Sequence, residues 1–213
     1  MSERNLNNKV YQQIKQMMID YELIPGQRLT FTDLAEKLGV SRTPVNNALS
    51  ILAKEGFLDF VPNQGYSVHQ ITKEEADSLY EVREILELGA VEKIIANLTP
   101  EKLKILERRE KSFNQAVAEK ISRGRFLLDQ EYHAGIVELS GNPYLADYFR
   151  EVYQRIFLRH RISPLRGDRA AQAPLEHHEV LEAIRQRDVA RARQAISSHI
   201  RAGKEYIYSF IFD

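Results

Sequence analysis

Three histidines and an aspartate in the second half of the chain occupy positions where a helix would bury apolar side chains. Asp129 and His133 are four residues apart and share a predicted helix face with Ile136. His177 and His199 lie within the apolar stripes of two further predicted helices. Burying four such groups is unfavourable unless they satisfy one another. Imidazole nitrogens and a carboxylate suit zinc, nickel or manganese, so the pattern predicts a site for one of these divalent metals.

The same four residues have a simpler interpretation, which the sequence leaves open. A single buried histidine is usually a hydrogen-bonded core residue, and Asp129 with His133 could form a side-chain pair along one helix. The metal interpretation requires three helices to converge, and hydrophobic periodicity does not determine how helices pack.

Arg83 is a further charged residue on an apolar stripe, which it shares with Leu79, Leu86 and Ala90. A guanidinium presents two parallel donors that match a carboxylate. Arg83 is therefore a candidate to bind a carboxylate. An ion pair between Arg83 and a buried glutamate such as Glu87 is an equally open interpretation.

These residues belong to a region that is predicted to be helical from residue 72 to the last residues. Helices are expected from Thr72, from Thr99, over Ser122–Ser140, over 143–162, over about 173–187 and over 188–210. The segment Ser163–Ala173, which contains proline and glycine, is the predicted loop. Residues 71–213 are thus predicted to form an all-helical bundle.

The first third of the chain has a different pattern, two short helices followed by a hairpin. Thr30 can cap a helix with apolar residues at 31, 34, 35 and 38, and Gly39 can end it because glycine adopts positive φ without strain. Ser41 can cap the next helix, and Phe57–Val61 and Tyr66–Gln70 can pair as strands. The predicted fold is mainly α, with a winged helix-turn-helix over residues 1–70 before the bundle.

A short polar helix beside a hairpin has a shape that can enter a DNA major groove. The predicted DNA-binding residues are Thr32, Ser41, Arg42, Thr43, Asn46, Gln64 and Gly65. Residues 1–70 carry seven positive and seven negative side chains, so the domain lacks the basic excess that usually drives DNA affinity. Binding must then depend on local clustering, helix N-termini and two copies acting together. Winged helices that mediate protein contacts are the alternative.

The amino-acid composition and the absence of certain motifs limit the kinds of site and the classes of protein that we expect. The chain has no cysteine, which excludes disulfides and thiolate metal sites. No signal-like start and no apolar run of about 18 residues is present, so we expect a cytoplasmic protein without membrane contact. No general acid or base lies in a recognisable motif, and we expect no enzymatic activity.

The stretch LAEKLGVSRTPVNNAL resembles the signature of GntR-type bacterial transcription regulators, and the similarity runs from about Val10 to Gly65. The bundle resembles the FCD domain of the FadR subclass. Asp129 to His133 is similar to its D-x-x-F-H element with tyrosine in place of phenylalanine, Glu176-His177 begins another element, and His199 matches its last histidine. This resemblance implies Asp129, His133, His177 and His199 as metal ligands. It also implies a small carboxylate or sugar-acid effector, so residues 71–213 are expected to be an effector- and metal-binding, dimerising domain. Arg83 lies in the matching Y-E-V-R motif and is the candidate anchor for this effector.

Two positions depart from the family pattern. Thr32 and Asn46 stand where the family commonly has arginines that contact guanine or phosphate. Asparagine favours adenine, so the operator is expected to differ from the usual family site.

Together these features predict a homodimeric regulator that binds double-stranded operator DNA under the control of a small organic acid held near a zinc, nickel or manganese ion. A metal-dependent hydrolase and a metal-stabilised structural dimer without effector are the alternatives.

Overall fold

The computed structural model describes residues 3–118, 124–159 and 168–212. The chain divides into two compact units, Met1–Thr72 with Leu158–Arg161 and Lys73–Phe157 with Ile162–Asp213. The first unit therefore includes a short segment from late in the sequence. The division predicted from the sequence, residues 1–70 and 71–213, assigns this segment to the second domain. The fold class is as predicted, mainly α with an N-terminal winged helix-turn-helix followed by a helical bundle.

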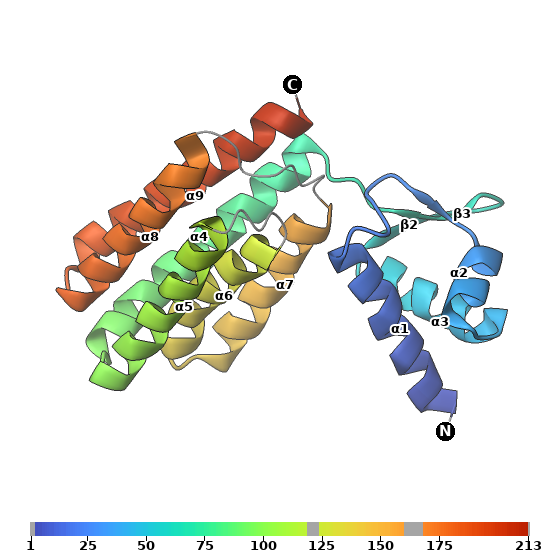
Figure 1. The fold of residues 1–213 in the computed structure, drawn as a ribbon, viewed down its shortest axis with the longest axis horizontal. Helices are drawn as coiled ribbons and strands as arrows, with labels where there is room; N and C mark the ends of the chain where they lie inside the picture. Colours follow the sequence, from blue (N-terminus) through green and yellow to red (C-terminus); the bar gives the residue numbers. More distant parts are fainter. Residues whose placement is uncertain (1–2, 119–123, 160–167, 213) are drawn as a thin grey trace. The chain divides into compact units, whose positions relative to one another are not determined.

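The first unit combines three helices with a small antiparallel sheet (Figure 1). Its elements are α1 (Glu3–Ile19), β1 (Arg28–Leu29), α2 (Phe31–Leu38), α3 (Arg42–Lys54), β2 (Leu58–Val61) and β3 (Gly65–Val68). Helix α1 packs against α3, and Val10 and Ile14 are fully buried with Val45 and Leu49. Burial of these apolar side chains is the main stabilisation of so small a unit.

Local signals explain both ends of α2. The Thr30 hydroxyl accepts a hydrogen bond from Asp33 N at 3.1 Å and so caps α2, as predicted. Gly39 ends α2 with a φ of 64°. Ser41 is the N-cap residue of α3, but its side chain makes no capping hydrogen bond, so the prediction that its hydroxyl caps this helix is wrong.

The wing differs slightly from the predicted hairpin. Strands β2 and β3 are shorter than expected and β3 already begins at Gly65, which has a φ of 83°. Strand β1 adds to the free edge of β3, giving the order β1-β3-β2. Neither α1 nor β1 is predicted from the sequence; β1 has only two residues, too few for an alternating pattern.

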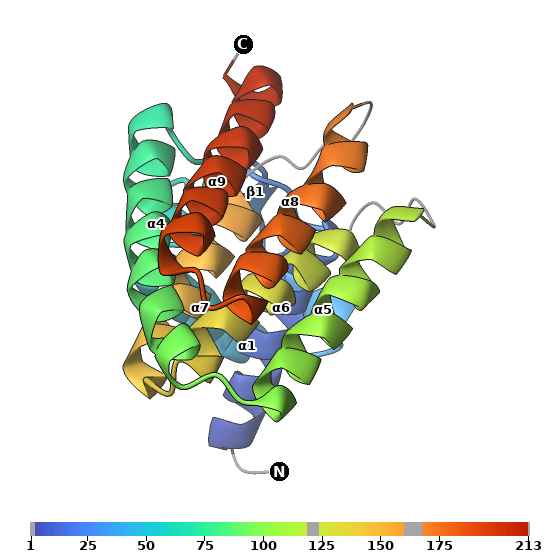
Figure 2. The ribbon, with the colours of Figure 1, turned by 90° about the vertical axis from the view of Figure 1, so that its left-hand side faces the viewer.

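The second unit is a bundle whose helices run side by side (Figures 1 and 2). They are α4 (Lys73–Ala96), α5 (Pro100–Ala118), α6 (Gly124–Leu139), α7 (Pro143–Arg159), α8 (Asp168–Arg185) and α9 (Val189–Ile211). Helix α4 contacts α6, α8 and α9, and α5 contacts α6 and α8. The core includes the buried side chains of Ile94, Leu106, Tyr132, Ile184 and Ile196.

The predicted loop over Ser163–Ala173 is wrong for residues 168–173, which form the start of α8. Pro174 lies inside this helix, although proline removes a backbone donor. The side chain of Arg169 bonds Glu176 two turns later, on the other side of the proline, and Ala173 is buried. These contacts outweigh the local helix-breaking signal. Residues 163–167, the helix start at Ser122 and the helix end at 160–162 lie outside the described residues.

Among the residues that the structure describes, no helix combines the length and the apolar character needed to cross a membrane.

Candidate functional site

The structure brings together the four residues of the predicted metal site. Helix α6 supplies Asp129 and His133, α8 supplies His177 and α9 supplies His199. One ligand atom from each lies within 4.8 Å of the other three. This is close to the span of two metal–ligand bonds of about 2.0–2.2 Å each. A single ion placed among these atoms could therefore be reached by all four side chains.

Individual distances show how closely the donor atoms approach. His133 Nε2 lies 3.0 Å from His199 Nε2, and His177 Nε2 lies 3.2 Å from Asp129 Oδ1. His133 and His177 are fully buried, and His199 is 3% exposed. The aspartate is the part of the cluster that solvent can reach, since 17% of its side chain is exposed.

His177 provides the test of whether a metal fits these residues. Both of its ring nitrogens are buried. Nδ1 has no hydrogen-bond partner within the described part of the chain, and Nε2 lies 3.2 Å from Asp129 Oδ1 without the geometry of a hydrogen bond. Its ring stacks on Tyr132 and packs against Phe113, with centroid distances of 4.3 Å and 4.4 Å. A buried imidazole whose hydrogen-bonding groups are not satisfied is costly, and coordination of a metal ion would remove that cost. The donor set and the incompletely satisfied imidazole both fit a divalent metal.

The protonation of the cluster also suits metal binding. Burial lowers the pKa of His177, and it lowers the pKa of His199 from 6.5 to about 3, outweighing the opposing effect of Glu176. Burial would raise the pKa of Asp129, but the neighbouring histidines hold it well below its usual value. Near neutral pH His177 and His199 are therefore neutral imidazoles and Asp129 is a carboxylate, the forms that bind metal.

We expect acid to destabilise the metal-free protein between pH 6.5 and pH 5. In this range the unfolded chain protonates its histidines, whereas His199 stays neutral in the folded state because its pKa is lowered to about 3. The free energy of unfolding should fall by about 2 kcal/mol for this residue alone. Urea unfolding of chelator-treated protein at pH 6.5 and at pH 5 measures this change in the free energy of unfolding.

The titration of the buried carboxylates does not add to the change in stability between pH 6.5 and pH 5. Arg83 and His133 overcome the effect of burial and lower the pKa of Glu87 from 4.5 to about 2, so its stabilising contribution is lost only below about pH 4.5. A His199→Gln variant removes the imidazole whose pKa is lowered, so its free energy of unfolding should depend less on pH in this range. An equal dependence in this variant and the unchanged chain would contradict the assignment.

Arg83 is buried beside the cluster, with 5% of its surface exposed. Its Nε donates to Glu87 Oε1 at 2.7 Å, so the ion pair considered from the sequence is present. Nη2 is buried and has no hydrogen-bond partner among the described residues. The guanidinium carbon lies 4.8 Å from the ring centroid of Tyr153, whose hydroxyl donates to Asp129. Arg83 thus has both an internal partner and a free donor close to the aspartate.

Several residues around the cluster escaped the sequence analysis. The sequence analysis considered Glu87 only as a possible partner of Arg83. In the structure the second oxygen of Glu87 also contacts His133. Glu176, which bonds His199, and Tyr153 were not identified as site residues. The four-residue spacing of Arg83 and Glu87 could have indicated a pair, but the contacts of Glu176 and Tyr153 to other helices have no local signal.

The predicted DNA-binding residues lie in the first unit on α2, α3 and the wing. Arg42, Thr43 and Asn46 are exposed on the first turns of α3. Thr32 on α2 and the residues Ser41 and Arg42 line one shallow depression at the turn between the two helices. The Ser41 hydroxyl, which caps nothing, is exposed there. Gln64 and Gly65 form the end of the wing turn.

Arg28 is a DNA-facing candidate that the sequence analysis missed. It is exposed on β1, and its Nη2 donates to Gln64 Oε1 at 2.7 Å. A neutral amide orients the guanidinium without cancelling its charge. Lys37, by comparison, pairs with Glu22 at 2.5 Å. Only pairing across the sheet places Arg28 beside the wing, 36 positions from Gln64 in the sequence.

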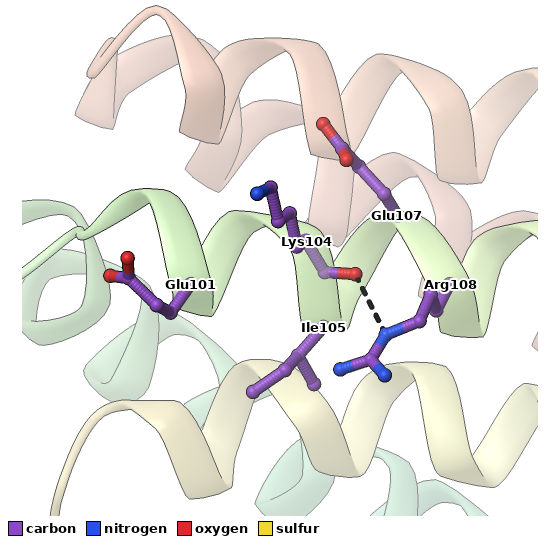
Figure 3. A pocket seen from close by; sticks show the side chains of 5 residues that line it. All are labelled: Glu101, Lys104, Ile105, Glu107 and Arg108. Atoms are coloured by element: carbon purple, nitrogen blue, oxygen red, sulfur yellow. Dashed lines mark hydrogen bonds between the residues drawn. The ribbon is translucent and has the colours of Figure 1, made fainter.

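A second depression lies on α5 and is lined by Glu101, Lys104, Ile105, Glu107 and Arg108 (Figure 3). All five residues belong to two turns of one helix, and Arg108 Nε donates to the backbone oxygen of Lys104 at 3.3 Å. Among the described residues no other element contributes to the lining, so this part of the surface lacks the converging groups of a binding site.

Comparison with known proteins matches both parts of the chain to families. Residues 6–68 match the family described as bacterial regulatory proteins, gntR family, and residues 78–202 match the FCD domain. The HTH-type transcriptional regulator YdhC of Bacillus subtilis is 30% identical over 199 residues, covering 92% of this chain and 88% of that protein. The Nta operon transcriptional regulator of Aminobacter aminovorans is 36% identical over 141 residues, covering 66% of each chain.

Solved structures agree with these matches. The structure of Escherichia coli McbR/YncC superposes with a TM-score of 0.78 at 26% identity, covering 98% of this chain and 99% of that chain. A transcriptional regulator from Rhodococcus sp. RHA1 has a TM-score of 0.80 at 20% identity over the same shares, which supports the fold alone. The relatives YdhC, the Nta operon regulator and McbR are each described as transcriptional regulators.

Proposed function

Because the chain belongs to the GntR family of bacterial transcriptional regulators and carries an FCD domain, we propose that a small organic acid bound beside a divalent metal controls its binding to operator DNA. The observation that carries this proposal is the convergence of Asp129, His133, His177 and His199 next to the unpaired donor of Arg83. The effector is a small carboxylate or sugar acid.

The four converging residues would hold zinc, nickel or manganese. When bound, the ion supplies a positive charge that attracts an acidic ligand. Arg83 Nη2 is the donor available to a carboxylate, and Tyr153 connects the two because its ring lies against Arg83 and its hydroxyl bonds Asp129. This arrangement provides one cation and one directional donor for the same anionic ligand.

DNA binding is assigned to the first unit. Ser41, Arg42, Thr43 and Asn46 would enter the major groove with α3, Thr32 would lie at its edge, and Gln64 and Gly65 would contact the backbone or minor groove together with Arg28. We propose a homodimer, in which two copies reach half-sites about one helical turn apart or a multiple of it. An effector changes this binding only if its affinity differs between two arrangements of the dimer.

Retention of a DNA duplex tests this function. A labelled duplex from the region upstream of the protein's own gene should bind more tightly than an unrelated duplex at the same salt concentration. Addition of zinc and a panel of small monocarboxylates and sugar acids should then identify one that changes the affinity. Chemical conversion of that acid by the metal-loaded protein would favour the hydrolase alternative, and the absence of any response to acids would favour the structural dimer.

Replacing Asn46 with arginine is expected to change which base the protein prefers. Asparagine pairs best with adenine N6 and N7, and arginine pairs with guanine O6 and N7. Each such contact discriminates by about 1–3 kcal/mol, so selection from random duplexes should shift one position in each half-site from adenine to guanine. Gln12→Arg on the exposed side of α1 adds the same charge away from α3 and serves as control. An identical base profile for Asn46→Arg and the unchanged chain would exclude a base contact.

A further inference from the structure

A chain of three buried groups leads from α4 to the metal-site histidine of α6. Arg83 Nε donates to Glu87 Oε1 at 2.7 Å, and Glu87 Oε2 lies 2.6 Å from His133 Nδ1. Glu87 is fully buried, so it cannot exchange these partners for water. Each oxygen of the Glu87 carboxylate therefore has one fixed partner, Arg83 for Oε1 and His133 for Oε2.

A second chain of the same composition leads from α8 to the histidine of α9. Arg169 Nη1 donates to both oxygens of Glu176, at 2.5 Å and 2.6 Å, and Glu176 Oε2 lies 2.8 Å from His199 Nδ1. Arg169 is 8% exposed, and 24% of the Glu176 side chain is exposed. Two Arg–Glu–His chains on different helices thus end at the same cluster.

The chemistry of the carboxylate determines where each imidazole proton lies. An ionised carboxylate only accepts hydrogen bonds, so the Nδ1 atoms of His133 and His199 must carry the protons. In a neutral ring the other nitrogen, Nε2, then has a lone pair. The two Nε2 atoms lie 3.0 Å apart. Two lone pairs at that distance repel each other unless a metal ion or a proton lies between them.

We infer that Glu87 and Glu176 are positioning residues of the proposed metal centre, each holding one histidine in the tautomer that presents Nε2 to the ion. The inference rests on the metal site assigned under the proposed function. Arg83 and Arg169 hold the carboxylates in place and balance their charge. His177 has no carboxylate on its Nδ1 among the described residues, so its tautomer is not set in this way.

Nitrogen-15 NMR of the metal-free protein, combined with zinc titration, tests the inference. In the unchanged chain His133 and His199 should both show a protonated Nδ1 and an unprotonated Nε2. Glu176→Ala should convert His199 to a mixture of tautomers and weaken zinc binding by about 10- to 100-fold. Glu176→Gln, whose amide oxygen can still accept from Nδ1, should restore part of both properties.

Glu110→Gln is the matched control, because Glu110 makes a similar contact of 3.0 Å to the exposed His178, outside the cluster. It should leave zinc affinity and both tautomers unchanged. Glu87→Gln should alter His133 in the same way as the changes at Glu176 alter His199; if it fails to fold, the variants at Glu176 decide.

The possible failures are distinguishable. Zinc binding and a His199 tautomer that are unaltered in Glu176→Ala would overturn the inference and leave the metal site intact. Weaker zinc binding with an unaltered tautomer would also overturn it, because the glutamate would then act only through its charge. No zinc binding by the unchanged chain would refute the metal site and the inference together, without affecting DNA binding.

Discussion

Replacing His177 with alanine is expected to abolish stoichiometric metal binding. His177 is fully buried, its Nδ1 has no hydrogen-bond partner in the described chain, and its Nε2 lies 3.2 Å from Asp129 without the geometry of a hydrogen bond, so coordination of a metal would satisfy the ring better than its present contacts. Loss of a direct ligand should weaken zinc binding by more than about 100-fold, since loss of a residue that only orients a ligand costs about 10- to 100-fold. Elemental analysis of dialysed protein gives the metal content per chain.

Thermal unfolding provides a second measurement of the same change. An ion present at 100 times its Kd stabilises the folded state by about 2.7 kcal/mol, which corresponds to roughly 5–10 °C in Tm for a chain of this size. The unchanged protein should show this increase on addition of zinc, and His177→Ala should not. His177→Gln fills more of the space between the two aromatic rings and replaces the alanine variant if that one does not fold.

The neighbouring residue His178 provides the control for this experiment. It lies on the same helix, but 59% of its side chain is exposed and it pairs with Glu110 outside the cluster. His178→Ala should retain the full metal content and the full increase in Tm. A His177→Ala protein that retains the metal content of the unchanged chain would refute the assignment of His177 as a ligand.

Replacing Arg83 is expected to produce the second large effect, on the response to the effector. Arg83 Nη2 is buried without a partner in the described residues, next to the Tyr153 ring and near the candidate ligand Asp129. Charge-assisted hydrogen bonds contribute about 1.5–3 kcal/mol, so the Kd of the effector should rise about 10- to 100-fold in Arg83→Lys, which keeps the charge but loses the guanidinium fork. Lysine can still pair with Glu87 and so keep this carboxylate on His133, and the metal content should therefore stay unchanged.

Lysine is the informative substitution because alanine has a second consequence. Removal of one partner of a buried ion pair leaves the other charge uncompensated and destabilises a protein by about 3–5 kcal/mol. Arg83→Ala would leave Glu87 in that state, and folding and ligand binding would be confounded. Calorimetry with the acid identified in the duplex assay measures the Kd, and Arg185→Lys in a surface ion pair with Glu107 is the control. An unaltered Kd in Arg83→Lys would limit Arg83 to its structural pair with Glu87.

Errors in the predicted fold occurred where local and tertiary signals disagree. Proline and glycine indicated a loop up to Ala173, but α8 already begins at Asp168, because Arg169 and Ala173 gain buried contacts in the bundle. Strand β1 has only two residues and exists because β3 offers it an unpaired edge. Such elements depend on neighbours that are distant in the sequence, so periodicity and capping signals do not detect them.

The sequence alone determined the properties that depend on residues within one or two turns of each other. These include the α2–turn–α3 arrangement, the hairpin, the succession of helices after residue 72 and the inward direction of Arg83 and the histidines. Each follows from helix or strand periodicity and from the conformations open to threonine, glycine and proline at element ends.

Only the tertiary structure decided what the inward-facing polar groups meet. Asp129, His133, His177 and His199 converge because α6, α8 and α9 pack side by side, and helix packing depends on side chains far apart in the sequence. The same packing places Glu87 on His133 and Glu176 on His199, and pairing across the sheet places Arg28 on Gln64. The periodicity of a helix predicts which of its residues are buried. Which residues of other helices they contact depends on the packing of the whole core.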